Sequence, residues 1–425
     1  MVGMSEEQWE QFVMDELAEL AWEPKTGKAI AKGSGERESW DELIIPWRLR
    51  DAVERINPGL PMSAVDDAAK LVLSATSRDA LAENQRIHEF LTRGIRSITY
   101  TDEYGAERNP TIWLLDRRNV ENNDFMAARQ VQVVDGEHRR RFDVVLYVNG
   151  MPLGFIELKK ASASGDDLKS AHTQLTGTYV DELPLAFRCN VVCVVSDGVA
   201  MQYGTAFTPF EHFAPWNVDD DGKPVKQPAA DLVDQSIMLL LHGMFRHDRF
   251  LDLLFGYVAF ARDADGMVKR IAKPHQYFAV AEAVRKTVEA VRGDGRAGVV
   301  WHTQGSGKSM EMELYANQVL THPSLGNPTI VVLTDRTDLD DQLYTTFDAS
   351  DLLPEKPVQI GTREELRTVL ANRRMGGIVF TTLQKFGRTK EERDNGLPHP
   401  RLSDRRNIIV IVDEAHRSHY DDLVG

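Results

Sequence analysis

The sequence is poor in cysteine. Its 425 residues include two, Cys189 and Cys193, in an apolar segment that we expect to be a buried strand. Four positions apart on a strand, they would lie roughly 13 Å from each other, which is too far for a disulfide. We therefore expect two small core residues of a cytoplasmic protein and exclude a disulfide-stapled scaffold.

The sequence also lacks a long apolar run and an excess of basic residues. It nowhere has roughly 18 consecutive apolar residues, and its start, Met-Val-Gly-Met-Ser-Glu-Glu, has acids where a secretory signal has basic residues. We expect neither a membrane span nor a signal peptide. With 50 Lys+Arg and 65 Asp+Glu, the net charge of −15 argues against a protein that coats DNA through bulk positive charge, although local basic grooves remain open.

Apolar periodicity divides the chain into regions. At roughly 100–200 residues per domain, this length predicts two or three globular domains. We predict a first domain over residues 1–210, a linker with connecting helices over 211–265, and a second domain over 266–425. The first domain is expected to open with an amphipathic helix, 5–21, whose other face is acidic, and to contain the alternating, strand-like runs 97–100, 111–115, 127–134, 142–148 and 153–158.

In the second predicted domain, continuous apolar runs alternate with helical patterns. Such runs are typical of strands buried on both faces of a parallel sheet. They cover residues 298–301, 329–333, 378–380 and 408–412. The predicted fold class is therefore α/β.

Two adjacent predicted strands carry the first group of charged residues. Asp143 lies on one strand, Glu157 and Lys159 lie on the next, and Asn149-Gly150 between them is a strong hairpin signal. Because side chains alternate along a strand, Glu157 and Lys159 project from the same face. Two carboxylates and an ammonium could thus converge on an otherwise apolar scaffold.

This set of residues fits metal-assisted hydrolysis of a phosphodiester. Asp143 and Glu157 would hold Mg²⁺, and Lys159 would position or polarise the attacking water and steady the developing negative charge. The alternative is a solvated hairpin edge with alternating charges. Gln174 and Tyr179, on a predicted helix over 167–180, could face this metal site or lie on the surface.

A glycine-containing loop separates the predicted strand 298–301 from a predicted helix. The loop reads His302-Thr-Gln-Gly-Ser-Gly-Lys-Ser309, and strand, loop and helix are the context that a phosphate-binding loop requires. His302 stands where the strict pattern has glycine, which resembles the helicase variant of the loop. We expect close phosphate approach at the backbone of Gly305, Ser306 and Gly307, contact of Lys308 with the β and γ phosphates, and Mg²⁺ coordination by Ser309.

Other segments of the second domain fit the same nucleotide site. Asp413-Glu414-Ala415-His416 follows the run 408–412; Asp413 would hold Mg²⁺ and Glu414 would activate the hydrolytic water. Gln276 occupies the place of an adenine-reading glutamine in the ATPases that this region resembles. Four residues that follow predicted strands are candidates for contacting a nucleic-acid backbone: Thr334, Arg336, Thr381 and Thr382.

These motifs resemble two known architectures joined in one chain. Asp143 with Glu-x-Lys resembles the restriction-endonuclease-like nuclease domain, and the loop with Asp-Glu-Ala-His resembles the first RecA-like, P-loop ATPase lobe of superfamily 2 helicases. Together they resemble the restriction and motor subunit of type I restriction-modification enzymes over about residues 120 to 420, including Asn123-Asp124-Phe125 and Pro274-His275-Gln276-Tyr277. That family often has Gln and Tyr four positions apart after Glu-x-Lys, whereas Gln174 and Tyr179 are five apart.

The resemblance implies an ATP-dependent endonuclease that uses Mg²⁺ and ATP and cuts unmodified double-stranded DNA after translocating along it. It further implies two partners, a methyltransferase subunit and a specificity subunit, and no membrane. It also implies a second motor lobe; because the sequence stops nine residues after His416, we do not expect this stretch alone to translocate. Two other hypotheses stay open: a superfamily 2 helicase or translocase with a structural hairpin, and a non-enzymatic remnant that docks on the methyltransferase core.

Overall fold

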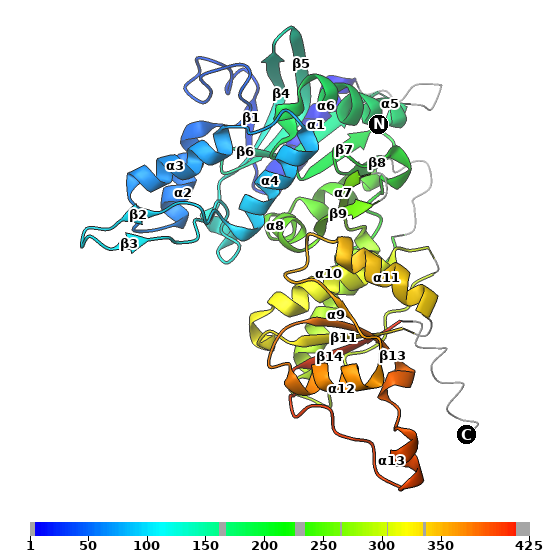
Figure 1. Ribbon diagram of the computed structural model, residues 1–425. Helices are drawn as coiled ribbons and strands as arrows, with labels where there is room; N and C mark the ends of the chain where they lie inside the picture. Colours follow the sequence, from blue (N-terminus) through cyan, green and yellow to red (C-terminus); the bar gives the residue numbers. More distant parts are fainter. Residues whose placement is uncertain are drawn as a thin grey trace. The chain divides into compact units, whose positions relative to one another are not determined.

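The computed structural model describes residues 5–160, 167–225, 234–263, 266–303, 305–334 and 337–413. The chain forms two compact units, one of residues 1–258 and 268–274 and the other of residues 259–267 and 275–425 (Figure 1). Both units combine helices with parallel strand pairs, which confirms the α/β class. Within the described ranges, no helix is long and apolar enough to cross a membrane.

The first unit is built on a six-stranded mixed sheet with the order β1-β4-β5-β6-β7-β8. Strands β4, β5 and β6 are successive antiparallel neighbours, whereas β1 runs parallel to β4 and β7 runs parallel to β6. Every residue of β6 is buried, so this strand lies in the centre of the core. The strands are β1 (Glu23–Thr26), β4 (Phe125–Asp135), β5 (His138–Val148), β6 (Met151–Leu158), β7 (Val192–Ser196) and β8 (Met201–Gly204).

Helices cover this sheet. Helix α1 begins at the capping box that Ser5 and Gln8 form, and it packs on β4, β5 and β6 through a face that includes Val13 and Leu17. Helix α5 packs on β6 and β7 and continues through a π-helical segment, η2, into α6. The helices of this unit are α1 (Glu6–Glu19), α2 (Pro46–Ile56), α3 (Met62–Leu73), α4 (Ala80–Arg93), α5 (Asp167–His172), η2 (Thr173–Thr178), α6 (Tyr179–Glu182), α7 (Asp234–Met244) and α8 (His247–Gly256).

Some expectations for the first unit are wrong. The runs 97–100 and 111–115 give only the short β2 (Tyr100–Thr101), paired with β3 (Glu107–Arg108), and a single bridge between Ile95 and Ile112. Ile98, Ile112, Leu114 and Leu115 of these runs are buried in packed loops, so alternation alone did not require a sheet. Cys189 precedes β7 instead of lying on it; both cysteines are buried and free, as expected.

Residues 211–258 lie within the first unit, whereas the sequence suggested a linker with connecting helices. The reason is apolar burial: Trp216, Phe245 and Leu254 are each at most 1% exposed. Trp22, just before β1, donates its indole N–H to the carbonyl oxygen of Phe245 at 2.8 Å. This segment therefore packs against the N-terminal part of the chain.

The second unit contains a four-stranded parallel sheet with the order β12-β13-β11-β14. On one face, Val331 and Val379 pack with helix α12; on the other, Phe380 contacts Phe347 of α11 edge-to-face. The strands are β11 (Thr329–Thr334), β12 (Val358–Gln359), β13 (Ile378–Thr382) and β14 (Ile408–Val412). The helices are α9 (Pro274–Ala290), α10 (Lys308–Thr321), α11 (Thr337–Ala349), α12 (Arg363–Asn372) and α13 (Lys390–Asp394). A hairpin of β9 (Val258–Asp263) and β10 (Gly266–Ile271) precedes these helices in the sequence, and its residues are divided between the two units.

The predicted strand 298–301 is absent from this sheet. Val299 is 81% exposed and Trp301 85% exposed, and neither belongs to a strand. Strand β14 forms the edge of the sheet, where Val410 and Val412 are also exposed. The apolar run was identified correctly, but an apolar run becomes a strand only where a neighbouring strand pairs with it.

Candidate active site

The predicted hairpin forms and brings Asp143 and Glu157 onto neighbouring strands. Asn149 and Gly150 both have positive φ, 52° and 75°, as a two-residue turn of this kind requires. A side chain at Gly150 would also meet the carbonyl oxygen of Ile45 at 2.6 Å, so two independent constraints favour glycine there. Strand β5 carries Asp143, and β6 carries Glu157.

An irregularity in the sheet lies directly opposite Asp143. The pairing of β4 with β5 passes from Arg129–Val144 to Val131–Phe142, and Gln130 between them has φ of 59°. A non-glycine residue in this left-handed conformation is strained, and such residues cluster at active sites. The Asp143 carboxylate crosses to β6, where its Oδ2 accepts a hydrogen bond from the backbone N–H of Leu158 at 2.9 Å.

Glu157 is the most enclosed member of the group, at 1% exposure. Its Oε1 accepts a hydrogen bond from Nζ of Lys159 at 2.8 Å, so the two residues share one face as predicted. Its Oε2 is buried and has no hydrogen-bond partner among the described residues. A buried carboxylate oxygen without a partner costs free energy, which makes it a ready ligand for a cation.

The electrostatics of the group favour a bound cation. Burial, followed by the charge of Asp143, raises the pKa of Glu157 to about 8. Burial likewise raises the pKa of Asp143, although the Leu158 hydrogen bond opposes it. Burial lowers the pKa of Lys159, but the adjacent Glu157 more than offsets this and the pKa is raised. Like-charged carboxylates held together out of water are the setting that a divalent metal stabilises.

Helix α1 adds acidic residues that the sequence did not reveal. Glu10 is 5% exposed and accepts a hydrogen bond from Nε2 of Gln130, the residue at the irregularity. Burial, together with the charge of Asp143, raises the pKa of Glu10 to about 7, and the charge of Glu6 raises the pKa of Asp143 and Glu157. We expected the acids of this helix to face solvent; the missed signal was an acid next to Trp9 on the apolar side.

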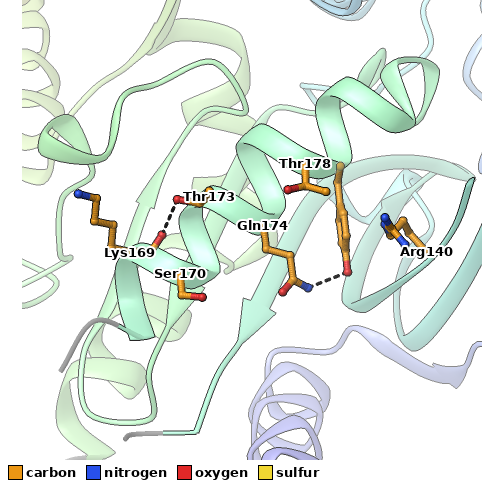
Figure 2. Close-up of a pocket in the computed structure, with 7 residues that line it drawn as sticks. Arg140, Lys169, Ser170, Thr173, Gln174 and Thr178 are labelled. Atoms are coloured by element: carbon orange, nitrogen blue, oxygen red, sulfur yellow. Dashed lines mark hydrogen bonds between the residues drawn. The ribbon is translucent and has the colours of Figure 1, made fainter. Parts of the chain in front are cut away.

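Gln174 and Tyr179 both face this group, because the helix that carries them is not regular. In an α-helix, residues five apart lie about 140° apart around the axis. The π-helical turn η2 places them together instead: Nε2 of Gln174 donates to Tyr179 Oη at 2.7 Å (Figure 2). The same Nε2 also donates to Oε1 of Glu157. Such π-turns are frequent at functional sites. The five-residue spacing is therefore compatible with a shared role.

The two glycines of the predicted phosphate-binding loop adopt a left-handed backbone and lead into a helix, although the strand expected before the loop is absent. Gly305 and Gly307 have φ of 82° and 88°, and Lys308 is the first residue of helix α10. Gln276, on the first turn of α9, donates from Nε2 to the carbonyl oxygens of Ser306 at 3.2 Å and Gly307 at 3.3 Å. A side chain at residue 307 would clash with the amide nitrogen of Gln276, so the contact between Gln276 and the loop requires glycine at this position.

His302, which replaces the first glycine of the strict pattern, supports the loop from one side. Its Nδ1 lies 2.7 Å from Oε1 of the buried Glu311, on the first turn of α10. His275 stacks edge-on against His302, with ring centroids 5.3 Å apart, and its Nε2 contacts the carbonyl oxygen of Ser306 at 3.0 Å. His302, in place of the usual glycine, therefore connects the loop to helix α10 through Glu311 and packs against His275. The spacing of the motif alone did not reveal these contacts.

The remaining predicted nucleotide and DNA residues are placed as follows. Asp413 follows β14, and its backbone N–H donates to the carbonyl oxygen of Leu333. Glu414, His416 and Arg336 lie outside the described residues. Ser309 is exposed on the first turn of α10. Three further candidates for DNA contact, Thr334, Thr381 and Thr382, have buried side chains at the ends of β11 and β13. Their contacts with DNA stay predictions.

Two family models match the chain. Residues 3–212 match the type I restriction enzyme R protein N terminus. Residues 275–424 match the SWI2/SNF2 ATPase. The first match contains the Asp143–Glu157–Lys159 group, and the second contains the phosphate-binding loop and Asp413.

The curated relatives carry names of one kind. The type I restriction enzyme HindI endonuclease subunit of Haemophilus influenzae is 39% identical over 98% of this chain and 39% of its own length. A Methanocaldococcus jannaschii protein, provisionally named the type I restriction enzyme MjaIXP endonuclease subunit, is 30% identical over 97% of the chain and 40% of its own length. The type I restriction enzyme SauMSSORF170P endonuclease subunit of Staphylococcus aureus is 24% identical over 73% of this chain and 31% of its own length. The chain thus spans about two fifths or less of these relatives.

Proposed function

The chain belongs to the R protein family of type I restriction enzymes, and on that premise we propose that it is the DNA-cutting and ATP-binding part of such a subunit. The nuclease would hydrolyse phosphodiesters of unmodified double-stranded DNA with Mg²⁺, at the group formed by Asp143, Glu157 and Lys159. The lobe with Lys308 would bind ATP and power movement along DNA. The observation that carries the proposal is the buried, partnerless Oε2 of Glu157 beside a second carboxylate and an ammonium.

The side chains have separate tasks in this proposal. Asp143 and Glu157 would hold the Mg²⁺, with Glu10 as a further acid within electrostatic reach. The bound ion would supply Lewis-acid stabilisation and a more acidic water. Lys159, held 2.8 Å from Glu157, would donate a hydrogen bond to the attacking water or to the phosphate oxygen and offset the negative charge that develops there. Gln174 would fix the rotamer of Glu157.

The nucleotide site would work through the backbone of the glycine loop. Gly305, Ser306 and Gly307 would present N–H groups to the phosphates, Lys308 would contact the β and γ phosphates, and Ser309 with Asp413 would hold a Mg²⁺. Gln276, already bonded to the loop, would read the adenine, and Glu414 would activate the water. Because the chain spans 39% of the HindI subunit, translocation and the methyltransferase and specificity partners are proposed for the longer protein.

The proposal predicts that this chain nicks supercoiled plasmid in the presence of Mg²⁺. Asp143→Ala and Lys159→Ala should reduce nicking by two orders of magnitude or more, because each removes a group that acts in the transition state. Lys308→Ala serves as the matched control: it should abolish ATP binding and leave nicking intact. Nicking that survives both nuclease substitutions would contradict the assignment.

Two alternatives predict different results. If the hairpin were structural in a helicase, Asp143→Ala would leave DNA cleavage absent or unchanged and alter only ATP-dependent steps. If the chain were a docking remnant, it would join the methyltransferase core without cutting DNA or binding ATP. The raised pKa of Glu157 and its buried Oε2 without a partner argue against a structural hairpin, since a purely structural site has no need of a buried carboxylate oxygen left without a hydrogen bond.

A further inference from the structure

An open hollow of about 680 Å³ lies along the helix beside the carboxylate group. Gln174 and Tyr179 line it, and Lys169 and Arg140 lie on opposite sides of Gln174 (Figure 2). The other lining residues carry hydroxyl groups: Ser170, Thr173 and Thr178. None of these lining side chains is acidic, although the whole chain has a net charge of −15.

The two cations are held differently. Arg140 forms a two-pronged ion pair with Glu182, with N–O distances of 2.5 Å, which fixes its guanidinium beside the hollow. Lys169, on the opposite side of Gln174, is exposed. Arg140 also belongs to four consecutive basic residues of β5, of which Arg139 and Arg141 are exposed, so positive charge continues along the β4–β5 hairpin.

We propose that this hollow, the Lys169–Arg140 groove, binds the phosphate backbone of duplex DNA next to the phosphodiester that is cut. The inference rests on the proposed nuclease function and deepens it. Lysine, arginine and hydroxyl side chains supply most protein contacts to DNA phosphates, and they position the duplex without reading its sequence. Gln174 joins the groove to the chemistry, because it lines the hollow and also donates to Oε1 of Glu157.

The groove explains how an acidic chain can engage DNA. Affinity for phosphates depends on the local cations that displace counterions, not on the net charge of the protein. Exposed Ser170 and Thr178 hydroxyls can donate to phosphate oxygens between the two cations. The proposed contacts number only a few, so the binding they give is weak, salt-dependent and independent of sequence.

The first test measures binding of a fluorescent duplex to the 425-residue chain in Ca²⁺, which is used to hold the metal site without cutting. Lys169→Ala should weaken binding several-fold at low salt and reduce the slope of log affinity against log salt by about 0.9 for one lost phosphate contact. The matched control is Lys70→Ala, on α3, which is also exposed and should change neither value.

The second test uses the buried state of both native cysteines, which leaves an introduced surface cysteine as the accessible thiol. Ser170→Cys, labelled with a photo-activated aryl azide, should crosslink the duplex in Ca²⁺. The same label on Ser63→Cys, an exposed serine of α3, should not. Crosslinking from the first position alone would support the groove.

Three results would overturn the groove: equal crosslinking from both positions, an unchanged salt slope in Lys169→Ala, or no duplex binding by the folded wild-type chain. The proposed function fails in a different way. If Ser170→Cys crosslinks DNA but Mg²⁺-dependent nicking persists after Asp143→Ala, the groove stands and the nuclease assignment falls.

Discussion

Single residues in the first unit hold charge where packing would favour apolar groups. Glu10 and Glu157 are each at most 5% exposed, and the charge of Asp143 acts on both. Natural proteins accept such destabilising arrangements mainly where function needs them. The molecule is therefore expected to gain stability when one of these carboxylates is neutralised without a change of shape.

Glu157→Gln should raise the melting temperature of the metal-free chain. With its pKa raised to about 8, the buried Glu157 must take up a proton on folding at neutral pH, which costs free energy. The amide keeps an acceptor for Lys159 and needs no such protonation, so a gain of about 1 kcal/mol would appear as roughly 2–4 °C. Thermal unfolding in EDTA measures it, with Glu103→Gln at an exposed acid as the control. A lower melting temperature for Glu157→Gln would mean that the carboxylate stabilises the fold.

Lys269 is a second buried charge, outside the proposed site. It is 2% exposed on β10, and its Nζ donates to the carbonyl oxygen of Asn190 at 2.6 Å. Burial lowers its pKa to about 7, against an ordinary value of 10.5. Between these values the unfolded chain binds a proton that the folded chain does not, so this residue makes stability rise with pH by up to about 1.4 kcal/mol per pH unit.

Lys269→Met should remove that rise. Urea unfolding at pH 7, 8, 9 and 10 would give the free energy of unfolding for both chains. As pH increases, the free energy of unfolding of the wild type should rise relative to that of the variant. Lys70→Met, at an exposed position, controls for general effects of alkaline pH. Parallel curves for Lys269→Met and the wild type would show that the buried amine keeps its ordinary pKa.

At the scale of elements, one helical turn decides whether two side chains meet. The π-turn η2 accommodates the fourth residue between Gln174 and Tyr179, so that Gln174 contacts both Tyr179 and Glu157. Gly177 lies within this turn, and a Cβ at this position would have only the Thr173 methyl group near it, at 4.0 Å. Little packing depends on Gly177, so the extra residue is absorbed locally.

Deleting Gly177 should therefore be tolerated. A regular α-helix would place the glutamine and tyrosine four apart, about 40° around the axis, and the contact with Glu157 would persist. Insertion of an alanine after Thr176 should instead turn Tyr179 away and reduce nicking strongly. Circular dichroism would verify folding in both variants; loss of nicking in the deletion with normal folding would contradict the register argument.

The sequence predicted many of the helices and strands correctly, but it did not predict the irregular backbone within them. Periodicity identified α1, the hairpin with Asn149-Gly150 and the strands β11, β13 and β14, because each depends on local pattern. It could not identify the strained Gln130 opposite Asp143 or the π-turn, since both arise from tertiary packing. It also predicted a strand at 298–301 that finds no partner strand among the described residues.

For the whole molecule, the acidic balance and the partial coverage of the relatives limit what this chain does alone. We assign the proposed contact with DNA to local basic surface, the Lys169–Arg140 groove, and we propose ATP-driven movement only for the longer protein. What this chain contains is a buried carboxylate group suited to one divalent ion. The proposed DNA cleavage depends on that metal centre more than on any other feature.

The most direct test is a calorimetric titration of the nucleotide-free chain with Mn²⁺, as a substitute for Mg²⁺ with similar oxygen ligands. We predict one ion per chain for the wild type, no comparable binding for Glu157→Gln, and unchanged binding for Ser309→Ala, whose role is confined to the nucleotide site. Binding of Mn²⁺ to Glu157→Gln as tight as to the wild type, or no binding to the folded wild type, would contradict the proposed metal centre.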